Sequence, residues 1–379
     1  MKVIDSIPNQ DALWAADEFI NYFENFTSIE DYLRYVKKEV VVQSNQITPL
    51  QDYFFNEDIH PEDMEFEIKF IGQRFQKSLP QDHYKNLLAA VSSHNNESNI
   101  PGRELRWMVF EKNTGKTVGF IRFGSPTINS KPRNLWLGKP PNLSVFNRHA
   151  AMGFVIVPSQ PFGYNYLGGK LLALMCVSHF ARETLNEVFE KDIAWFETTS
   201  LYGSTTSSSQ YDGLKPFIRY KGLTTSSFTP NMHDKAFGDF RKWFMEKNGD
   251  HIVDPTVSGR KMKTQMRMIA IIKDSLKQYD VKEYEKFCQF HKDTTKLNEQ
   301  KRFFISTYGY ENVPQMIRGE ETVLRKAPNY DRFTKQGILD WWRPKASRRY
   351  EQLKSDGRLR RKLELWSESF DIDILREGK

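Results

Sequence analysis

Cysteine is scarce in this chain of 379 residues, which contains only Cys176 and Cys288. Two cysteines cannot build a disulfide scaffold, and both lie in apolar patterns typical of helices, so the sequence favours a reducing compartment. Long apolar runs are missing as well. No window approaches the ~18 residues that a membrane-spanning helix needs, and the N-terminal residues lack the apolar stretch of a signal peptide. We therefore expect a cytoplasmic protein without a membrane partner.

Common metal and nucleotide motifs are also absent. The spacings HxxxH, CxxC and HExxH do not occur, so we expect no metal ion. The P-loop pattern GxxxxGK[ST] fails at Leu171, and the dinucleotide pattern GxGxxG is missing. One set of charged residues keeps a further hypothesis open. Asp63, Glu67 and Lys69 are reminiscent of metal-dependent nucleases, in which carboxylates hold Mg²⁺, although their spacing is short for that class.

Positive charge is present in excess, with 55 Lys and Arg against 48 Asp and Glu. The net charge of +7 favours a polyanionic partner. Residues 341–362 carry nine Lys or Arg against two acidic residues, together with Trp341, Trp342 and Tyr350. Cations neutralise phosphates and aromatic rings stack on bases, so this segment is our main nucleic-acid prediction, although a solvated amphipathic helix would look similar. Its candidate contacts are Arg348, Arg349, Arg358, Arg360 and Arg361.

The pattern along the chain predicts an α+β fold. Residues 1–95 and 246–379 are expected to be mainly helical, and 96–245 to form an α/β core. Within that core, alternating runs at 105–111 and 116–123 predict a hairpin that turns at Gly115. A strand over 152–158, a helix over 167–188 and a strand over 192–198 follow, which implies a mixed sheet with a central crossover helix. In the last segment, an apolar helical stripe is expected to pack in a core and comprises Met262, Met266, Ile269, Ile272 and Leu276.

The stretch "VIVPSQPFGYNYLGGKLLAL" at 155–174 links the predicted strand to the crossover helix. The first turn of a helix presents free amides and a partial positive charge, and Gly168, Gly169 and Lys170 would suit a phosphate or pyrophosphate there. The same glycines could instead allow the helix to pack tightly on the sheet. The residues alone leave both interpretations open.

The order of these elements resembles the central part of the GNAT acyltransferase superfamily. Residues 119–224 are similar to two divergent branches, the Mom-like DNA-modification proteins of phages and the DruA-like proteins of a bacterial anti-phage defence system. The resemblance is carried by "GFIRFGSP", "WLG" at 136–138, Asn142-Leu143, "LGGKLLAL", "ETT" at 197–199, Tyr211 and "GLT" at 222–224.

This resemblance implies a site for an activated acyl donor. The donor would be acetyl-CoA or another activated acyl compound, because Tyr164-Asn165 replace the second half of the usual Q/R-x-x-G-x-G/A loop. The residues expected to hold it are Val157, Gln160, Gly163, Gly168, Gly169 and Lys170.

Four further candidates lie around the predicted strands. Glu197, at the end of a strand, could act as a general base on an amine, and Tyr211 could protonate the departing group. His149 could act as an acid or base, and with its neighbour Arg148, a candidate nucleic-acid contact, it could bind an anionic substrate, although a lone histidine is more often structural. Trp136 could stack on a nucleic-acid base, and Arg133 nearby is a further candidate nucleic-acid contact. Each of these residues could equally serve the packing of the core or the loops.

The leading hypothesis is a transferase that moves an acyl-type group to an amine on a DNA base, in phage DNA modification or phage–host conflict. It would act in the cytoplasm, which is the host's if a phage encodes it. The alternative is a non-catalytic DNA- or protein-binding protein on a degenerate transferase scaffold, and the third hypothesis is the metal-dependent nuclease. A deep cleft where the strands 152–158 and 192–198 separate would favour the transferase, and a filled cleft would speak against it.

Overall fold

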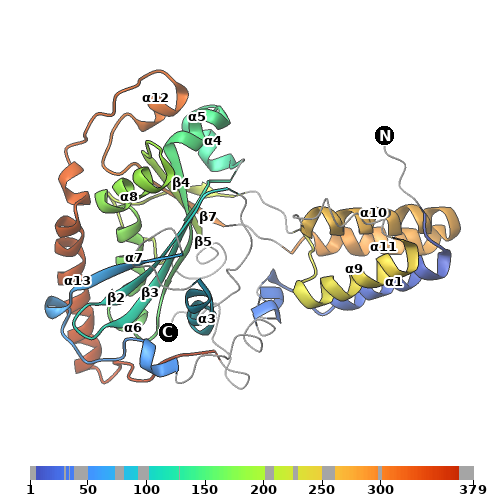
Figure 1. The fold of residues 1–379 in the computed structure, drawn as a ribbon, viewed down its shortest axis with the longest axis horizontal. Coiled ribbons are helices and arrows are strands. Elements are labelled where there is room, and N and C mark those ends of the chain that lie inside the picture. Colours follow the sequence, from blue (N-terminus) through green and yellow to red (C-terminus); the bar gives the residue numbers. More distant parts are fainter. Residues whose placement is uncertain are drawn as a thin grey trace. The chain divides into compact units, whose positions relative to one another are not determined.

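The structure is a computed structural model. It describes residues 6–29, 31–33, 35–37, 50–72, 81–92, 102–127, 129–200, 209–224, 229–249, 261–297 and 301–366. The chain forms two compact units, one from Met1–Val36 with Ser226–Glu299 and one from Lys37–Thr225 with Gln300–Lys379 (Figure 1). These units do not coincide with the three predicted segments, because each is assembled from stretches that are distant in the sequence.

The first unit is helical, and its core lies between aromatic and aliphatic faces of four helices. Phe19, Phe244, Ile272 and Phe287 are among its buried side chains. The helices are α1 (Asn9–Phe23), α9 (Asp234–Asn248), α10 (Lys261–Tyr279) and α11 (Val281–Thr294).

The predicted apolar stripe of α10 is confirmed at its C-terminal end and wrong at its N-terminal end. Ile269, Ile272 and Leu276 are buried, but Met262 and Met266 are exposed. Near the start of α10, the buried side chain that faces the core is that of Gln265. Its side-chain amide accepts from the N–H of Met232 at 2.9 Å and donates to the carbonyl of that residue at 3.1 Å. A polar side chain with both hydrogen bonds satisfied can replace an apolar one in a core.

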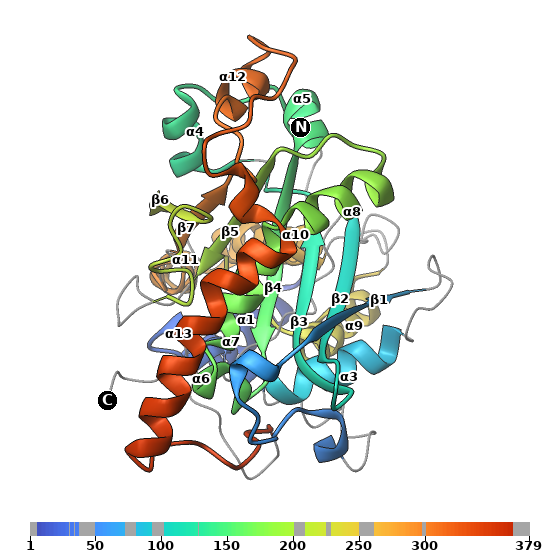
Figure 2. The ribbon, with the colours of Figure 1, turned by 90° about the vertical axis from the view of Figure 1, so that its left-hand side faces the viewer.

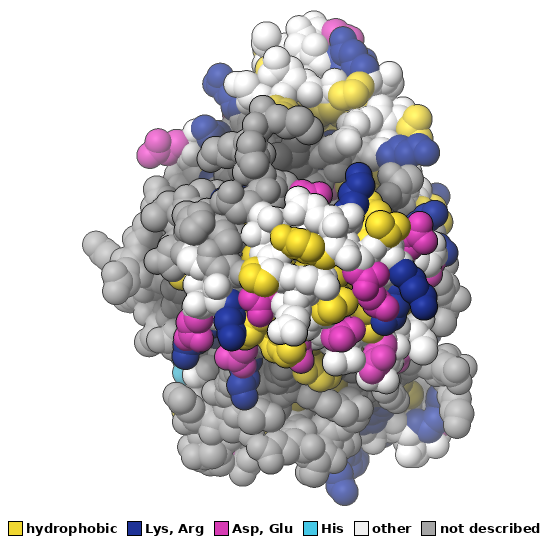
Figure 3. Space-filling view, turned by 90° about the vertical axis from the view of Figure 1, so that its right-hand side faces the viewer, with side chains coloured by type: hydrophobic (Ala, Val, Ile, Leu, Met, Phe, Trp, Pro, Cys, Tyr) yellow, Lys and Arg dark blue, Asp and Glu magenta, His cyan; other side chains and the backbone are white. Residues whose placement is uncertain are grey.

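Charge is distributed unequally between the two units. Residues 1–36 and 226–299 contain 16 Lys and Arg and 18 Asp and Glu, whereas the rest of the chain contains 39 and 30. On the face shown in Figure 3, which includes the helical unit, cationic and anionic side chains are interspersed with apolar ones. The basic excess of the protein therefore belongs to the second unit.

The second unit is built on a seven-stranded sheet with the order β1-β2-β3-β4-β5-β7-β6. The strands β4 and β5 are parallel, and the other neighbouring pairs are antiparallel. This mixed sheet, with helices around it, confirms the predicted α+β class. The strands are β1 (Phe66–Ile71), β2 (Glu104–Glu111), β3 (Lys116–Gly124), β4 (Ala150–Pro158), β5 (Trp195–Ser200), β6 (Arg219–Leu223) and β7 (Arg302–Ser306).

Several predicted elements are confirmed and three details are corrected. The hairpin β2–β3 turns at Gly115, which has a φ of 68°. The predicted helix over 167–188 is two helices, because the Ser178 hydroxyl accepts from the N–H of Ala181 and so begins a second helix. The strands β1 and β7 lie in segments predicted to be helical. The helices of the crossover are α6 (Phe162–Asn165), α7 (Gly168–Cys176) and α8 (His179–Phe189).

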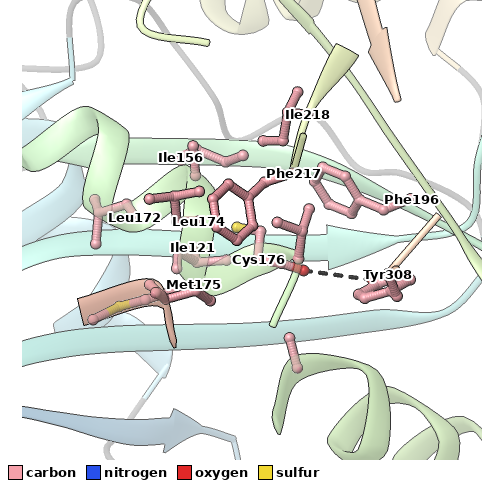
Figure 4. Close-up of a cluster of buried hydrophobic side chains, with 14 of the residues drawn as sticks. Ile121, Ile156, Leu172, Leu174, Met175, Cys176, Phe196, Phe217, Ile218 and Tyr308 are labelled. Atoms are coloured by element: carbon pink, nitrogen blue, oxygen red, sulfur yellow. Dashed lines mark hydrogen bonds between the residues drawn. The ribbon is translucent and has the colours of Figure 1, made fainter. Parts of the chain in front are cut away.

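Helices cover the two faces of the sheet. On one face, α7 and the long helix α13 (Lys335–Ser355) lie over the central strands (Figure 2). The side chains of Leu172 and Leu174 pack there among Ile121 and Ile156, and the carbonyl of Cys176 accepts from the Tyr308 hydroxyl at 3.4 Å (Figure 4). The opposite face carries α3 (Gln81–Val91). The remaining helices of this unit are α4 (Lys131–Leu137), α5 (Leu143–His149) and α12 (Val313–Arg318).

The two parallel strands separate half-way along. They pair from Ala150 with Trp195 to Gly153 with Thr198, and among the described residues the second half of β4 pairs with no strand on that side. Beyond this point β5 continues to pair with β7 as far as Ser200. The separation lies beside the loop that connects β4 to α7, where the donor site was predicted.

Candidate functional site

A fully buried ion pair joins β5 to α4 and contains a predicted catalytic residue. Glu197 and Arg133 are both 0% exposed, and Nη1 of Arg133 lies 3.0 and 3.2 Å from the two carboxylate oxygens. The indole N–H of Trp195 donates to Oε2 at 3.0 Å. Burial raises the pKa of Glu197, and Arg133 and Trp195 oppose this rise. The carboxylate is therefore held inside the protein, and Arg133, a predicted nucleic-acid contact, offers no surface to a phosphate.

Tyr211, the predicted proton donor, lies on the other face of the sheet from Glu197. Glu197 and Thr198 are consecutive in β5, so their side chains point in opposite directions. The Tyr211 hydroxyl forms hydrogen bonds with the side chains of Thr198 and Gln210, and its ring packs against Phe304 at 5.2 Å. Burial raises the pKa of Tyr211 to about 12. The structure does not assemble these two residues into an acid–base pair.

In the part that the structure describes, Gln210 contacts β4 beside the point where β4 and β5 separate. Nε2 of Gln210 donates at 2.9 Å to the carbonyl of Ile156, in the half of β4 that pairs with β3 but not with β5. The Lys170 ammonium donates to the carbonyls of Gln210 and Asp212. Burial lowers the pKa of Lys170, and Asp212 opposes the shift. Gln210 was not singled out in the sequence, because nothing in a single glutamine within a polar loop indicates a contact with β4.

In the predicted donor loop between β4 and α7, the backbone N–H groups of residues 163–166 donate hydrogen bonds within the loop itself. Four consecutive N–H groups, those of residues 163–166, donate to oxygen atoms of residues 159–162 at 2.8 to 3.0 Å. Three of these acceptors are backbone carbonyls, and the fourth is the side-chain oxygen Oε1 of Gln160. Amides that already have acceptors inside the protein are not available to a pyrophosphate.

The predicted donor glycines leave room for neighbouring side chains. A Cβ atom on Gly168 would lie 2.4 Å from the ring of Phe162, and one on Gly169 would lie 2.3 Å from Oε1 of Gln210. A Cβ atom on Gly163 would lie 2.6 Å from Nε2 of its neighbour Gln160. Of the two interpretations that the sequence left open, tight packing of the crossover is the one these contacts favour.

The C-terminal part of the chain packs onto the same loop. Nε of Arg349, on α13, donates to the carbonyl of Tyr164 at 2.5 Å, and the guanidinium of Arg360 lies 3.7 Å from the centre of the Tyr164 ring. Asn165 and the backbone of Arg360 exchange two hydrogen bonds, at 2.8 and 3.1 Å. Two of the five predicted tail arginines thus fasten this segment to the donor loop.

The other three predicted tail arginines are exposed. Arg358 forms an ion pair with Asp356, and Arg361 forms one with Asp58 at 3.4 Å. Arg348 forms no ion pair within the described ranges. These three guanidinium groups are placed where a nucleic acid could reach them.

The remaining predicted residues have local roles in the described structure. His149 is buried, with Nδ1 2.7 Å from the carbonyl of Asp192 and 3.9 Å from its carboxylate. Its neighbour Arg148 is exposed. Val157 lies partly buried in β4 opposite Phe120 of β3.

A second group of cations was missed in the sequence. Lys215, Arg219 and Lys221 lie at the edge of the sheet formed by β6, and the ammonium of Lys221 lies 4.7 Å from the ring of Trp136. Trp136, the predicted base-stacking residue, is half-buried and also contacts the ring of Trp195 at 5.1 Å. These cations are separated by apolar residues, so they formed no run of charge that would have drawn attention.

The acidic set of the nuclease hypothesis lies in and before β1. Lys69 forms an ion pair with Glu67 at 3.6 Å, and Asp63 lies in the short 3₁₀ turn that precedes the strand. Among the residues that the structure describes, no three His, Cys, Asp or Glu side chains are grouped so that they could hold a metal ion.

Comparison with known proteins gives a match to a protein family. Residues 25–208 match the family model of the Druantia protein DruA. No curated protein and no solved structure matches the chain at a significant level. The matched stretch includes β1 to β5, the donor loop and the Glu197–Arg133 pair, and it ends before β6, β7 and α13. None of the helices described in the structure is long and apolar enough to cross a membrane.

Proposed function

We propose that this protein acts in anti-phage defence as a nucleic-acid-binding protein, with its transferase-like sheet serving as a scaffold. The similarity of residues 25–208 to the Druantia protein DruA supports the defence role. The observation that carries the binding role is the fastening of a cationic C-terminal segment over the predicted donor loop. This contact occupies the loop and at the same time holds α13 and residues 358–362 in a fixed place.

Two exposed cations of α13, Lys345 and Arg348, support contact with phosphates. Trp341, Lys345 and Arg348 follow one another at helical spacing, and the ammonium of Lys345 lies 4.2 Å from the centre of the Trp341 ring. Arg348 and Lys362 are exposed and form no ion pair with a described residue. Cations that form no ion pair can contact phosphates without breaking one. Each such contact favours binding, because it releases counterions condensed on the polyanion.

A salt series tests this proposal. The affinity for a fluorescent DNA duplex, measured by anisotropy, is expected to fall steeply with salt concentration. In the double variant R348E/K362E the logarithmic slope is expected to become shallower by roughly 0.9 for each lost phosphate contact. The control is K277E/K282E in the helical unit, which makes the same charge change at two exposed lysines. Salt-independent binding, or equal slopes in the two variants, would contradict the proposal.

Phage challenge links binding to defence. Cells that carry the protein with its native neighbouring genes are expected to resist phage, and R348E/K362E is expected to weaken that resistance more than K277E/K282E does. Equal protection by both variants, with reduced DNA binding in only one, would separate binding from defence.

A second candidate function, acyl transfer to an amine of a nucleic acid, is favoured by the separation of β4 from β5 after Gly153 and Thr198. We expect no binding of an acyl donor, because the amides of residues 163–166 have internal acceptors and Gln210 and Phe162 occupy the space beside Gly169 and Gly168. Acetyl-CoA should leave the thermal unfolding midpoint unchanged at concentrations that would stabilise a binding protein by mass action. A concentration-dependent rise of the midpoint would favour the transferase.

A further inference from the structure

The seven-stranded sheet ends at β1 on one side and at β6 on the other (Figure 2). The β6 edge has a register irregularity between Tyr220 and Gly222. It also carries Arg219 and Lys221, and bulges and cations of this kind keep other strands away from an edge. By contrast, the six residues of β1, "FEIKFI", pair with β2 without a register shift and contain no proline or glycine. Among the described residues, no strand pairs with the outer side of β1.

The backbone groups of β1 alternate in direction, and one hydrogen bond fixes their order. The N–H of Lys112, next to β2, donates to the carbonyl of Glu65, next to β1, at 2.7 Å. In an antiparallel pair, residues that exchange hydrogen bonds alternate with residues whose N–H and C=O groups point away from the partner strand. Because the register of the two strands is unbroken, residues 67, 69 and 71 bond to β2. Residues 66, 68 and 70 therefore direct their backbone groups to the outer side.

A second copy of β1 complements this edge in one antiparallel register. Pairing joins outward-facing residues to each other, so Ile68 can lie opposite Phe66, Ile68 or Phe70 of the second copy. The first of these registers sets Glu67 against Glu67, and the third sets Lys69 against Lys69. The second sets Glu67 against Lys69 twice, because the two copies are related by a twofold axis. Opposite charges facing each other stabilise a strand pair and like charges destabilise it, so the charges select the second register.

The two charged side chains are accessible for such a contact. The side chain of Glu67 is 52% exposed and that of Lys69 is 37% exposed, and the two form an ion pair of 3.6 Å within the chain. In the selected register they occupy the pairs that lie between the hydrogen-bonded ones, where facing Cα atoms are closest, at about 4.5 Å. Two copies would therefore bring two carboxylates and two ammonium groups together in an alternating cluster on one face of the sheet.

The other face of β1 supplies apolar contacts. Ile68 is half-buried and would lie opposite Ile68 of the second copy, with Phe66 opposite Phe70 on either side. The ring of Trp107, on β2, lies 6.0 Å from the ring of Phe70 and 5.7 Å from that of Phe180, on α8. Phe180 is 42% exposed. Apolar surface therefore remains exposed beside this edge, and burying it favours association.

We propose that the outer edge of β1 joins two copies of this protein into a symmetric dimer with one continuous sheet. Residues 66, 68 and 70 of the two copies exchange about six backbone hydrogen bonds across the twofold axis. Glu67 of each copy faces Lys69 of the other. This inference goes beyond the proposed nucleic-acid function and does not depend on it.

A charged residue on an edge strand also has a protective use, because it prevents pairing with the edge of another sheet. That use requires the charge of Lys69 but places no condition on the residue that would lie opposite. The dimer, in contrast, requires Glu67 and Lys69 to be complementary. Reversing the two charges singly and together therefore distinguishes a dimer interface from a protected edge.

The test measures the mass of the full chain in solution by sedimentation, at a series of protein concentrations and without nucleic acid. The wild type is expected to approach twice the 44.6 kDa of one chain as its concentration rises. E67K and K69E each replace two attractive pairs by two repulsive ones, so each is expected to raise the dissociation constant of the dimer by at least roughly tenfold. The charge-swapped variant E67K/K69E restores both pairs and is expected to dimerise like the wild type.

A mixture of the two single variants separates contacts between chains from the ion pair within one chain. E67K presents two lysines and K69E presents two glutamates, so an equimolar mixture is expected to form a mixed dimer although neither variant dimerises well alone. The matched control is E65K, which makes the same charge change two residues earlier. In the selected register Glu65 lies opposite Ile71, so E65K is expected to leave the dissociation constant within about twofold of the wild type. Circular dichroism shows whether each variant is folded.

The outcomes separate this inference from the proposed function. A wild type that stays monomeric, a dimer that persists in both single variants, or a mixture that forms no mixed dimer overturns the inference. Loss of the dimer in each single variant, with recovery in E67K/K69E and in the mixture, supports it. A monomer that binds the DNA duplex through Arg348 and Lys362 refutes the dimer alone, and a dimer that does not bind the duplex refutes the proposed function alone.

Discussion

The ion pair between Glu197 and Arg133 allows a structural role to be distinguished from a catalytic one by stability alone. The substitution is Glu197→Gln, which keeps the size of the side chain and removes its charge. Both partners are 0% exposed, and Nη1 of Arg133 contacts both carboxylate oxygens, at 3.0 and 3.2 Å. Removing one partner of a buried pair leaves the other charge without compensation and typically costs about 3–5 kcal/mol.

That loss is large relative to the whole stability of a folded domain, which is about 5–15 kcal/mol. For a unit of this size, each kcal/mol lowers the unfolding midpoint by roughly 2–4 °C. We therefore expect Glu197→Gln to lower the midpoint of the α/β unit by roughly 6–20 °C. The measurements are urea unfolding followed by tryptophan fluorescence and thermal unfolding followed by circular dichroism.

The double variant Arg133→Met/Glu197→Leu is the control for the charge pair. It removes both charges and fills their volume with apolar atoms, a change that is often neutral or stabilising. The Trp195 indole N–H, which donates to Oε2 at 3.0 Å, then loses its acceptor, at a cost of about 1–3 kcal/mol. The double variant should still be more stable than Glu197→Gln. If Glu197→Gln is as stable as the wild type, and phage resistance is lost nevertheless, the structural argument is refuted and a role in catalysis regains support.

Two further predictions concern other parts of the fold. Gly168→Ala places Cβ 2.4 Å from the ring of Phe162 and should destabilise the α/β unit by about 1–3 kcal/mol in urea unfolding. As the control, the Cβ of Gly238→Ala in α9 meets nothing within 4 Å, and this change should stabilise the helical unit by up to about 1 kcal/mol. Equal effects of the two substitutions would contradict the packing argument. Burial, followed by the charge of Lys273, lowers the pKa of His291 from 6.5 to about 4. The unfolded chain therefore binds this proton first, and the helical unit should lose stability as the pH falls from about 6.5 towards 4. Thermal scans across this range should show the loss flattened in His291→Gln, and an unchanged profile would exclude His291 as its source.

The strands that the sequence predicted correctly are those with an unambiguous local signal. The hairpin β2–β3 combines alternation with a turn glycine, and β4 is a β-branched run that ends at Pro158. By contrast, β7 is a run of five residues, "RFFIS", within a stretch rich in charged helical patterns, and such a short run does not distinguish a strand from a helix.

The candidate site depended on contacts between residues far apart in the chain. Glu197 was correctly placed in a strand, but its partner Arg133 is 64 residues away, and an arginine beside a tryptophan in a loop looked like a surface contact. Glu197 and Tyr211 were predicted to share proton transfer, yet only the register of β5 reveals that the two residues lie on opposite faces of the sheet. The contact of Gln210 with β4 depends in the same way on a distant residue, because its side chain donates to the carbonyl of Ile156. Composition and spacing carry no information about such pairings.

The position of β7 has a consequence for synthesis of the protein. In the sheet β7 lies between β5 and β6, but in the chain it follows both, after the second part of the helical unit. While the ribosome translates residues 226–299, β6 has emerged without its neighbour and β5 presents an open edge. During the same interval α1 lacks α10, the helix against which it packs in the helical unit. A chain that stops before residue 302 therefore exposes a strand edge, and premature termination there should yield an aggregating fragment in place of a smaller functional protein.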